Sequence, residues 1–347
     1  MDRRHFLTLA GGAVAATALG GTALPAPAAP AGKAGPGRPH GVPAAVAGVA
    51  QAAAPGPALD AAAFHAARRF QPTRFGRIAY IEQGSGPAAL FLHGFPLNSF
   101  QWRGALPLLA PYRRCVAPDF LGLGYTEVAP GQGMAPQDQV AMLAELLDRL
   151  RIDSVDLIAN DSGGAVAQLF MVRYPQRVRS LLLTNCDSEP ECPPAALAPV
   201  IELAKAGTFA DQWFQPWLAD KALARSAQGI GGMCYADPAH PSDEALECYL
   251  GPLVSSPQRK AQMHAYAVAL ERNSLQGISA ALKASRVPVR VLWGEADDIF
   301  TAASARYFEQ AFGNGRGLRR LPGSKLFWPE ERPELLAAEA RALWGLA

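Results

Sequence analysis

The chain is poor in charged residues and in cysteine, and each shortage excludes a class of function. Only 18% of its 347 residues are charged and the formal net charge is +2 at pH 7, so no basic patch is present to attract nucleic acid. The 5 cysteines lack the spacing to histidine that zinc sites have, and we expect neither a metal nor a cofactor. We find no internal repeats, and beyond the first 28 residues no apolar run long enough to span a membrane. A small molecule is the expected partner.

The odd number of cysteines leaves at least one thiol unpaired. In an exported protein, Cys186 with Cys192 or Cys234 with Cys248 are candidate disulfides, and the sequence does not choose between pairings. Cys115 lies in the apolar run CVAP, where a buried free thiol is expected.

Residues 1–28 have the pattern of an export signal. Arg3 and Arg4 precede a Phe-Leu pair, a mildly apolar run rich in glycine, and an A-x-A sequence at 26–28. Paired arginines in this position are typical of a twin-arginine signal. The glycines dilute the apolar run, which argues against an uncleaved membrane anchor. We therefore expect an exported protein, periplasmic or secreted, with no stable membrane insertion after cleavage.

Composition then changes twice along the chain. Residues 29–66 are mostly Ala, Pro and Gly, a composition that cannot bury enough apolar surface to fold, so we expect a flexible linker. The remainder suits one α/β domain, with residues 67–190 and 283–347 as its core and a largely helical insertion at 191–282.

The predicted core alternates two kinds of segment. Short apolar runs such as 88–92 and 114–118 are typical of buried strands, whereas 134–150 has apolar residues at helical spacing with a polar opposite face. This alternation predicts a mostly parallel sheet with helices on both of its faces.

The segment SVDLIANDSGG at 154–164 is the most informative part of the core. An apolar run predicts a strand, and the Gly163-Gly164 pair precedes a helical pattern. Between them, Ala159-Asn160-Asp161-Ser162-Gly163 fits small-x-nucleophile-x-small, the sharp strand-to-helix turn known as a nucleophile elbow. The turn requires small flanking residues because its backbone is strained and crowded. Here it presents the carboxylate of Asp161.

Two alternative interpretations of this turn must be weighed. Centring it on Ser162 puts Asn160 at a small position, where asparagine fits poorly, so Asp161 is favoured. Asp161 could also serve only as the N-cap of the following helix. Motifs elsewhere in the chain argue against that simpler interpretation.

Those motifs carry a family resemblance. The segments HGFP at 93–96, APD at 117–119 and WGEAD at 293–297, together with the elbow at Asp161, resemble the α/β-hydrolase fold in order and spacing over roughly residues 70–347. HGFP combined with an aspartate at the elbow resembles the epoxide hydrolase and haloalkane dehalogenase branch of that fold. The helical insertion then corresponds to the cap that covers the active site.

The resemblance implies a role for each matching residue. Asp161 would attack a carbon that bears a leaving group and form an alkyl ester. The backbone N–H groups of Phe95 and Ser162 would form an oxyanion hole for hydrolysis of that ester. Asp297 would orient a protonated imidazole, and His93 would brace the loop that carries Phe95.

The resemblance leaves some positions open. Asp298 and Asp187 are alternates for the acid. Cap tyrosines in epoxide hydrolases donate hydrogen bonds to the epoxide oxygen, so the candidate substrate contacts in the cap are Tyr235, Tyr249, Tyr266 and His264. For each tyrosine, packing with a polar edge is the simpler explanation.

The family's catalytic histidine is missing from this chain. Aligning Gly323 and the Glu-Arg-Pro sequence at 331–333 puts Leu326 at its position, and no histidine follows His264. The candidate substitutes for the base are His240, His264, Glu330 and Lys325. Ser162 also stands where dehalogenases usually have a tryptophan that binds halide.

Three functions remain open from the sequence. The first is a hydrolase that uses Asp161 on an epoxide or alkyl halide, with an unusual means of activating water. The second is a catalytically impaired protein that keeps the pocket and binds a ligand, which Leu326 supports. The third is a lyase or isomerase in which Asp161 acts as a base.

Overall fold

The computed structural model describes residues 59–346, so the predicted export signal and most of the predicted linker lie outside it. Helix α1 (Ala61–Ala67) is capped by Asp60, whose Oδ1 accepts a hydrogen bond from the Ala63 amide at 2.7 Å. Phe64 of this helix is fully buried, with its ring 5.0 Å from that of Phe100. The linker prediction is therefore wrong over residues 61–66, because one aromatic side chain is enough to dock this alanine-rich helix.

A nine-stranded sheet forms the centre of the domain, in the order β1-β2-β4-β3-β6-β7-β8-β9, with β5 paired to β2. Strand β2 pairs antiparallel with β1, β4 and β5, and the remaining pairs are parallel, which confirms the predicted mostly parallel sheet. All residues of β3 and β6 are buried, which explains their continuous apolar sequences. The strands are β1 (Arg69–Thr73), β2 (Gly76–Gln83), β3 (Ala88–Leu92), β4 (Arg114–Pro118), β5 (Glu127–Val128), β6 (Val155–Asp161), β7 (Val178–Cys186), β8 (Val289–Gly294) and β9 (Gly315–Leu321).

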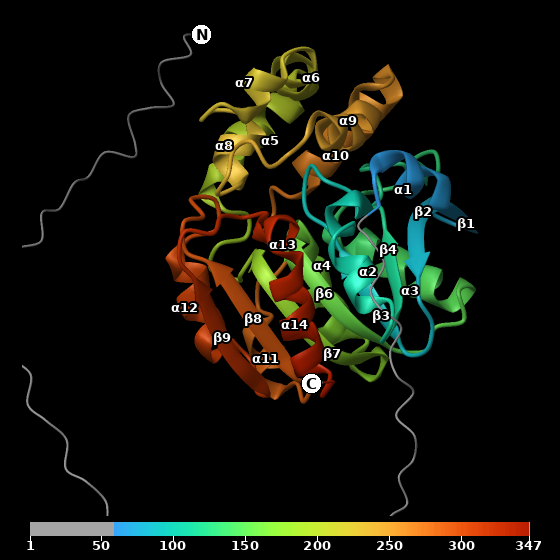
Figure 1. The fold of residues 1–347 in the computed structure, drawn as a ribbon, viewed down its shortest axis with the longest axis vertical. Coiled ribbons are helices and arrows are strands. Elements are labelled where there is room, and N and C mark those ends of the chain that lie inside the picture. Colours follow the sequence, from blue (N-terminus) through green and yellow to red (C-terminus); the bar gives the residue numbers. More distant parts are fainter. Residues whose placement is uncertain (1–58, 347) are drawn as a thin grey trace, which may run out of the picture. The chain divides into compact units, whose positions relative to one another are not determined.

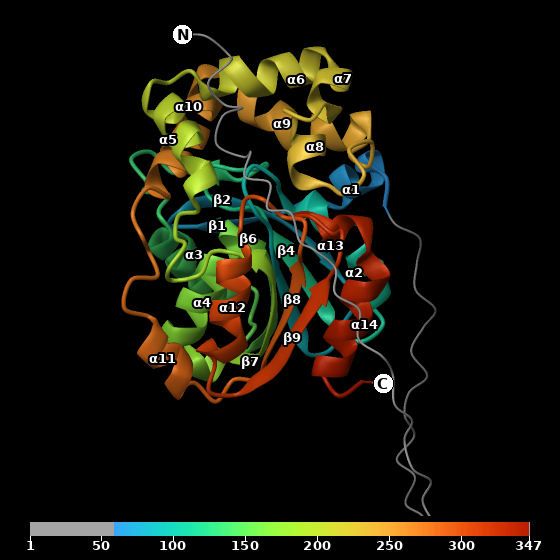
Figure 2. The same ribbon diagram turned by 90° about the vertical axis from the view of Figure 1, so that its left-hand side faces the viewer.

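Helices cover both faces of the sheet (Figure 2). One face carries α3 (Pro136–Arg149), α4 (Ser162–Arg173), α11 (Ser279–Ala284) and α12 (Ala302–Ala311). The other carries α2 (Ala105–Leu109), α13 (Trp328–Glu331) and α14 (Pro333–Leu343). Short 3₁₀ turns η2 (Ser99–Trp102) and η3 (Pro175–Arg177) precede α2 and β7. None of the helices in this part of the chain has both the length and the hydrophobicity that a membrane crossing requires.

The cap is a group of helices inserted after β7, above the carboxyl ends of the strands (Figure 1). Its elements are η4 (Ala195–Leu197), α5 (Ala198–Lys205), the π-helix η5 (Ala210–Phe214), α6 (Gln215–Ala219), α7 (Lys221–Arg225), α8 (Ile230–Cys234), α9 (Asp243–Val254) and α10 (Pro257–Ala269). Helix α11 instead packs against α4 and α12 of the core. The predicted cap boundary at residue 282 is therefore too late, because α11 already covers the sheet.

All five cysteines are free thiols, so neither candidate disulfide forms. Cys115 lies in β4 and is fully buried, as expected, and burial raises the pKa of its thiol to about 12.

Candidate active site

Asp161 is the last residue of β6 and adopts a backbone conformation that L-residues rarely occupy, with φ 56° and ψ −138°. The packing around Asp161 is so close that the nearby glycines could not carry a side chain. A Cβ on Gly94 would lie 2.2 Å from Asp161 Cβ, and one on Gly163 would lie 2.5 Å from the His93 carbonyl oxygen. A Cβ on Gly164 would lie 2.3 Å from Cys186 Cβ. Strain of this kind costs about 1–3 kcal/mol and persists where the surrounding packing enforces it.

Two backbone amides converge on one oxygen of this carboxylate. The Phe95 amide donates to Asp161 Oδ1 at 3.0 Å, and the Ser162 amide donates to the same oxygen. No hydrogen bond within residues 59–346 engages Oδ2 in the same way. These are the two amides that were expected to form an oxyanion hole, and neither of them contacts the second carboxylate oxygen, Oδ2.

His93 fixes the loop that carries Phe95. The Phe120 amide donates to His93 Nε2 at 3.0 Å, so the ring proton is on Nδ1, which donates to the Gly94 carbonyl at 2.9 Å. Burial lowers the pKa of His93, which favours this neutral form. Both ring nitrogens are occupied, so His93 braces the loop.

Asn160 ties three segments together beneath the elbow, a role that the sequence did not reveal. Its Nδ2 lies 2.8 Å from Thr184 Oγ1 and 3.1 Å from the carbonyl oxygens of both Asn185 and Leu326. Its Oδ1 accepts a hydrogen bond from Gln101 Nε2 at 2.7 Å. These bonds fix the end of β6 to the end of β7 and to the loop after β9.

Asp297 lies in the loop after β8, and its side chain is held from three directions. Asn185 Nδ2 donates to Oδ2 at 2.8 Å, while the amides of Ile299 and Phe300 donate to Oδ1 at 2.8 and 3.4 Å. Asn185 is itself fixed, because its Oδ1 accepts from Gly294 N at 2.7 Å. The carboxylate is therefore oriented and buried.

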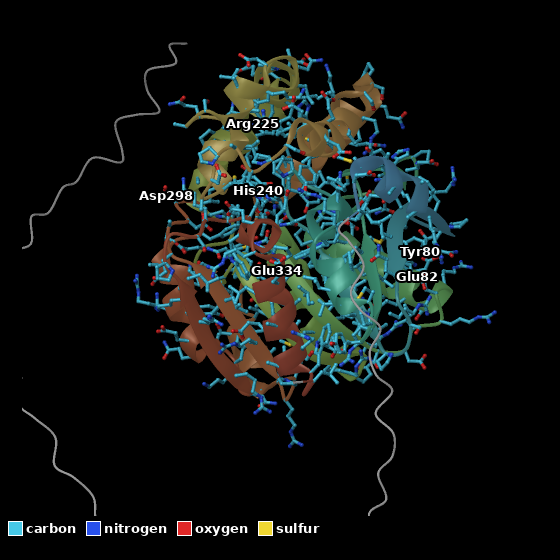
Figure 3. The ribbon with its side chains drawn as sticks, in the orientation of Figure 1. Tyr80, Glu82, Arg225, His240, Asp298 and Glu334 are labelled. Carbon is cyan, nitrogen blue, oxygen red and sulfur yellow. The ribbon has the colours of Figure 1, made fainter. Side chains whose placement is uncertain are left out.

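The two alternates for the acid differ from each other. Asp298 is exposed and lies at the margin of the molecule (Figure 3), so the structure does not support it as a member of the site. Asp187 follows β7 directly and is buried. Burial and the charge of Asp161 raise the pKa of Asp187 well above its usual range, which favours its neutral form.

The carboxyls at these strand ends share an environment without cationic partners. Burial raises the pKa of Asp161 to about 6, although the amides of Ser162 and Phe95 oppose the shift. Burial, aided by the charge of Asp161, raises the pKa of Asp297 to about 7. No lysine, arginine or histidine of residues 59–346 forms an ion pair with Asp161, Asp187 or Asp297. Both Asp161 and Asp297 therefore titrate close to neutral pH.

Tyr266 is the cap tyrosine that reaches the elbow. Its hydroxyl lies 3.0 Å from Ser162 Oγ, and its ring stacks on Phe95 with the centroids 5.7 Å apart. Burial raises the pKa of Tyr266, and the charge of Asp161 adds to that shift. Tyr266 and Ser162 thus form a pair of neutral hydroxyls beside the carboxylate.

Leu326 occupies the loop after β9 and is 1% exposed. The loop is fastened on two sides, since the Leu326 carbonyl accepts from Asn160 Nδ2 and the Phe327 amide donates to the Cys234 carbonyl at 2.9 Å. A buried aliphatic side chain at this position supplies no proton acceptor.

Comparison with known proteins decides the family. A model of the α/β hydrolase fold matches residues 87–326, which is more than half of the chain. The chain belongs to the α/β-hydrolase fold family.

Similar proteins in this α/β-hydrolase family carry the names of the predicted branch. Haloalkane dehalogenase 2 of Mycobacterium tuberculosis is 36% identical over 118 residues, 34% of this chain and 41% of that protein. Epoxide hydrolase 2 of Siraitia grosvenorii is 42% identical over 101 residues, 28% of this chain and 32% of that protein. The chain thus spans less than half the length of either relative. The structure of an ancestral haloalkane dehalogenase has a TM-score of 0.65 and 26% identity, covering 80% of this chain and 99% of that one.

Two of the three cap tyrosines are engaged away from the elbow of this α/β hydrolase. Tyr235 and Tyr249 are fully buried, and their hydroxyls donate to Glu330 Oε2 at 3.0 and 2.8 Å. Arg103 Nη1 lies 2.8 Å from Glu330 Oε1 and completes the cluster. The structure does not support Tyr235 and Tyr249 as substrate contacts, because a buried carboxylate requires their hydroxyl groups as donors.

The candidate substitutes for the missing histidine make their contacts away from Asp161, and the buried Nε2 of His240 has no hydrogen-bond partner among residues 59–346. His264 Nε2 accepts from the Ala210 amide at 3.1 Å, within the cap. His240 stacks on Tyr235 at the border of cap and core (Figure 3), with its Nε2 3.8 Å from Glu330. Lys325 Nζ donates to the Gly232 carbonyl at 2.6 Å. The structure brings none of these side chains into contact with Asp161.

Aromatic rings from the cap surround Phe95 and were not identified from the sequence. The rings of Phe209 and Phe214 lie 6.1 and 6.4 Å from that of Phe95, and Trp217 lies 5.9 Å from Phe214. The π-helix η5 presents Phe214, and π-helical turns are frequent at functional sites. The region above the elbow is therefore apolar and aromatic.

Proposed function

We propose that this α/β hydrolase forms an alkyl ester between Asp161 and a small apolar electrophile, and that an epoxide is preferred to an alkyl halide. The observation that carries the proposal is the asymmetric hydrogen bonding of Asp161. Both amides hold Oδ1, so Oδ2, which no backbone amide of residues 59–346 holds, is the oxygen that attacks carbon. With a pKa of about 6, the carboxylate is mostly ionised at neutral pH.

The preference for an epoxide follows from the leaving group. When Oδ2 bonds to an epoxide carbon, the C–O bond breaks and the alkoxide requires a proton. The hydroxyl pair of Tyr266 and Ser162, 3.0 Å apart, can supply it. Halide leaves as an anion and requires stabilisation by N–H donors, and Ser162 stands where haloalkane dehalogenases usually have a tryptophan for that purpose.

The aromatic surroundings favour a substrate with an apolar or aromatic substituent. Phe95 and Tyr266 are parallel, with an interplanar angle of 9°, and Phe209 lies beside them. Offset stacking between aromatic groups is worth about 0.5–1.5 kcal/mol beyond the area that it buries.

The same two amides serve the second step. Water that attacks Asp161 Cγ converts the ester carbonyl to an oxyanion, which the amides of Phe95 and Ser162 can stabilise. An oxyanion-hole donor of this kind is worth about 2.7–4 kcal/mol. Since Leu326 supplies no base, hydrolysis of the ester is expected to be the slow step.

Leu326 also favours a second candidate, a ligand-binding protein that has lost turnover. One experiment separates the two. The protein is incubated with styrene oxide, and separately with 2-bromoethylbenzene, and is then analysed by intact mass and for the diol or alcohol product. The proposal predicts an ester or product from the epoxide that is absent in Asp161→Asn, a variant that keeps the Oδ1 acceptor. Binding without adduct or product supports the second candidate.

A further inference from the structure

Hydrolysis of an Asp161 ester requires a group that accepts a proton from the attacking water. The identity of that group is inferred here on the basis of the proposed function. A general base typically contributes roughly 10²–10⁴-fold to such a step. The family supplies a histidine that this chain lacks, so the base must be found among the groups that surround Asp161.

The contacts and pKa values of most groups near Asp161 exclude them as the general base. His93 uses both ring nitrogens to hold its loop, and His264 accepts from a cap amide. The thiols of Cys186 and Cys234 are neutral, because burial raises their pKa values well above the usual range. The Tyr266 hydroxyl is likewise held neutral. Among the groups at these strand ends, the carboxyls of Asp187 and Asp297 remain.

The topology puts these two carboxyls at the same edge of the sheet as the nucleophile. Strands β6, β7 and β8 are adjacent and parallel, so Asp161, Asp187 and Asp297 follow one another along the carboxyl edge of the sheet. Asn185 connects the last two strand ends, because its Nδ2 donates both to Gly294 O at 2.9 Å and to Asp297 Oδ2 at 2.8 Å.

The two carboxyls differ in how they are held. Asp297 receives hydrogen bonds from one side-chain amide and two backbone amides, which favour its ionised form and fix its orientation. Asp187 has only the thiol of Cys192 as its side-chain partner, and burial raises its pKa well above the usual range. A raised pKa disfavours the ionised form that would accept a proton from water.

We propose that Asp297 is the general base that activates water against the Asp161 ester, in the place of the absent histidine. In this step a water proton passes to an oxygen of Asp297, and the water oxygen bonds to Asp161 Cγ. The ester carbonyl becomes an oxyanion held by Phe95 N and Ser162 N. Collapse of this intermediate breaks the bond between Cγ and the alkyl oxygen, and the departing alkoxide takes the proton from Asp297.

The charge on Asp161 affects when Asp297 can act as a base. The charge of Asp161 contributes to the raised pKa of Asp297, which is about 7 before reaction. Esterification neutralises Asp161 and removes that contribution, so Asp297 becomes easier to ionise once the ester has formed. The base is thus most available in the state that requires it.

The test is a single turnover with the protein in excess over styrene oxide, quenched in acid and followed by intact mass. For Asp297→Asn we expect the ester to form as in the unmodified protein and to decay roughly 10²–10⁴-fold more slowly. Asp298→Asn, at an exposed carboxyl, is the matched control and should leave both rates unchanged. The proposal would be overturned if the ester decayed as fast in Asp297→Asn as in the unmodified protein. It would also be overturned if the slow decay were seen in Asp187→Asn instead.

A measurement on the unmodified protein covers the case in which Asp297→Asn does not fold. The rate of ester decay should rise with pH through one ionisation at or below about 7 and then level off. A rate that keeps rising with hydroxide concentration through pH 9 shows that no protein base acts. Absence of any ester at Asp161 contradicts the proposed function. An ester that forms but decays at the same rate in Asp297→Asn contradicts only the role of Asp297 as the base.

Discussion

Asp161 is ionised at the expense of folding stability. Its pKa is about 6 in the folded protein against a reference of 3.8, because burial disfavours the charge. A carboxyl whose pKa is raised on folding contributes stability that is complete below the unfolded-state pKa and is lost as the pH rises through the folded-state value. Catalytic sites often carry such a conflict between reactivity and stability.

Asp161→Asn is therefore expected to stabilise the protein at alkaline pH. The gain should reach about 3 kcal/mol at pH 8, since each pKa unit corresponds to about 1.4 kcal/mol, and should shrink toward pH 4. Urea unfolding at both pH values measures it. Asp298→Asn, which changes an exposed carboxyl, should show no such dependence; equal gains at both pH values would contradict the burial of an ionised Asp161.

Gly94 is a second residue whose identity the geometry dictates. A methyl group there would lie 2.2 Å from Asp161 Cβ, and the loop would have to move, taking the Phe95 amide with it. Gly94→Ala should therefore lower the rate of ester decay by about 10²–10³-fold, as loss of an oxyanion-hole donor does. Gly251→Ala in α9 meets its nearest atom at 3.7 Å and should react normally. If Gly94→Ala reacted at the rate of the unmodified protein, Gly94 and Asp161 would not be so closely packed.

Helix α13 shows how one short element joins the cap to the core. Glu330 has only 2% of its side chain exposed and contacts Arg103 of the core and two cap tyrosines. Removing one member of a buried ion pair typically costs about 3–5 kcal/mol, because the other charge is left uncompensated.

We therefore expect Glu330→Gln to destabilise the protein by about 3 kcal/mol in urea unfolding. Glu334→Gln, in α14 and exposed (Figure 3), is the control and should change stability by less than about 0.5 kcal/mol. A Glu330→Gln variant as stable as the control would mean that the cluster does not hold the cap.

The sequence predicted features that depend on local patterns better than features that depend on contacts between distant residues. The parallel strands and the elbow follow from continuous apolar runs and from small residues at fixed spacing, which are local signals. Tyr235 and Tyr249 could not be assigned, because their partner Glu330 lies more than eighty residues away in sequence. Asn160 was judged only by its poor fit to a small position, although its hydrogen bonds join three distant segments.

At the scale of the whole molecule, the candidate site is assembled from distant parts of the chain. The loop after β3 supplies Phe95, the elbow supplies Asp161 and Ser162, and α10 of the cap supplies Tyr266. Strand β8 leads to Asp297. The sheet order brings the core residues together, and the cap adds the Tyr266 hydroxyl, to which we assign proton donation to the leaving group.

Tyr266→Phe should consequently separate the two substrates. Opening of styrene oxide should slow by roughly 10²-fold, because the alkoxide loses a proton donor, while displacement of bromide should change little. Tyr307→Phe, at a half-buried tyrosine that bonds Ser279, is the control. Equal slowing of both substrates would point to a packing role for Tyr266.

The central claim is that Asp161 itself becomes esterified, and the most direct measurement is peptide mapping after acid quench of the reaction with styrene oxide. The peptide that contains residue 161 should gain the mass of one epoxide, with fragmentation assigning it to Asp161, and the gain should be absent in Asp161→Asn. An adduct on any other residue, or product formation that persists undiminished in Asp161→Asn, would contradict the claim.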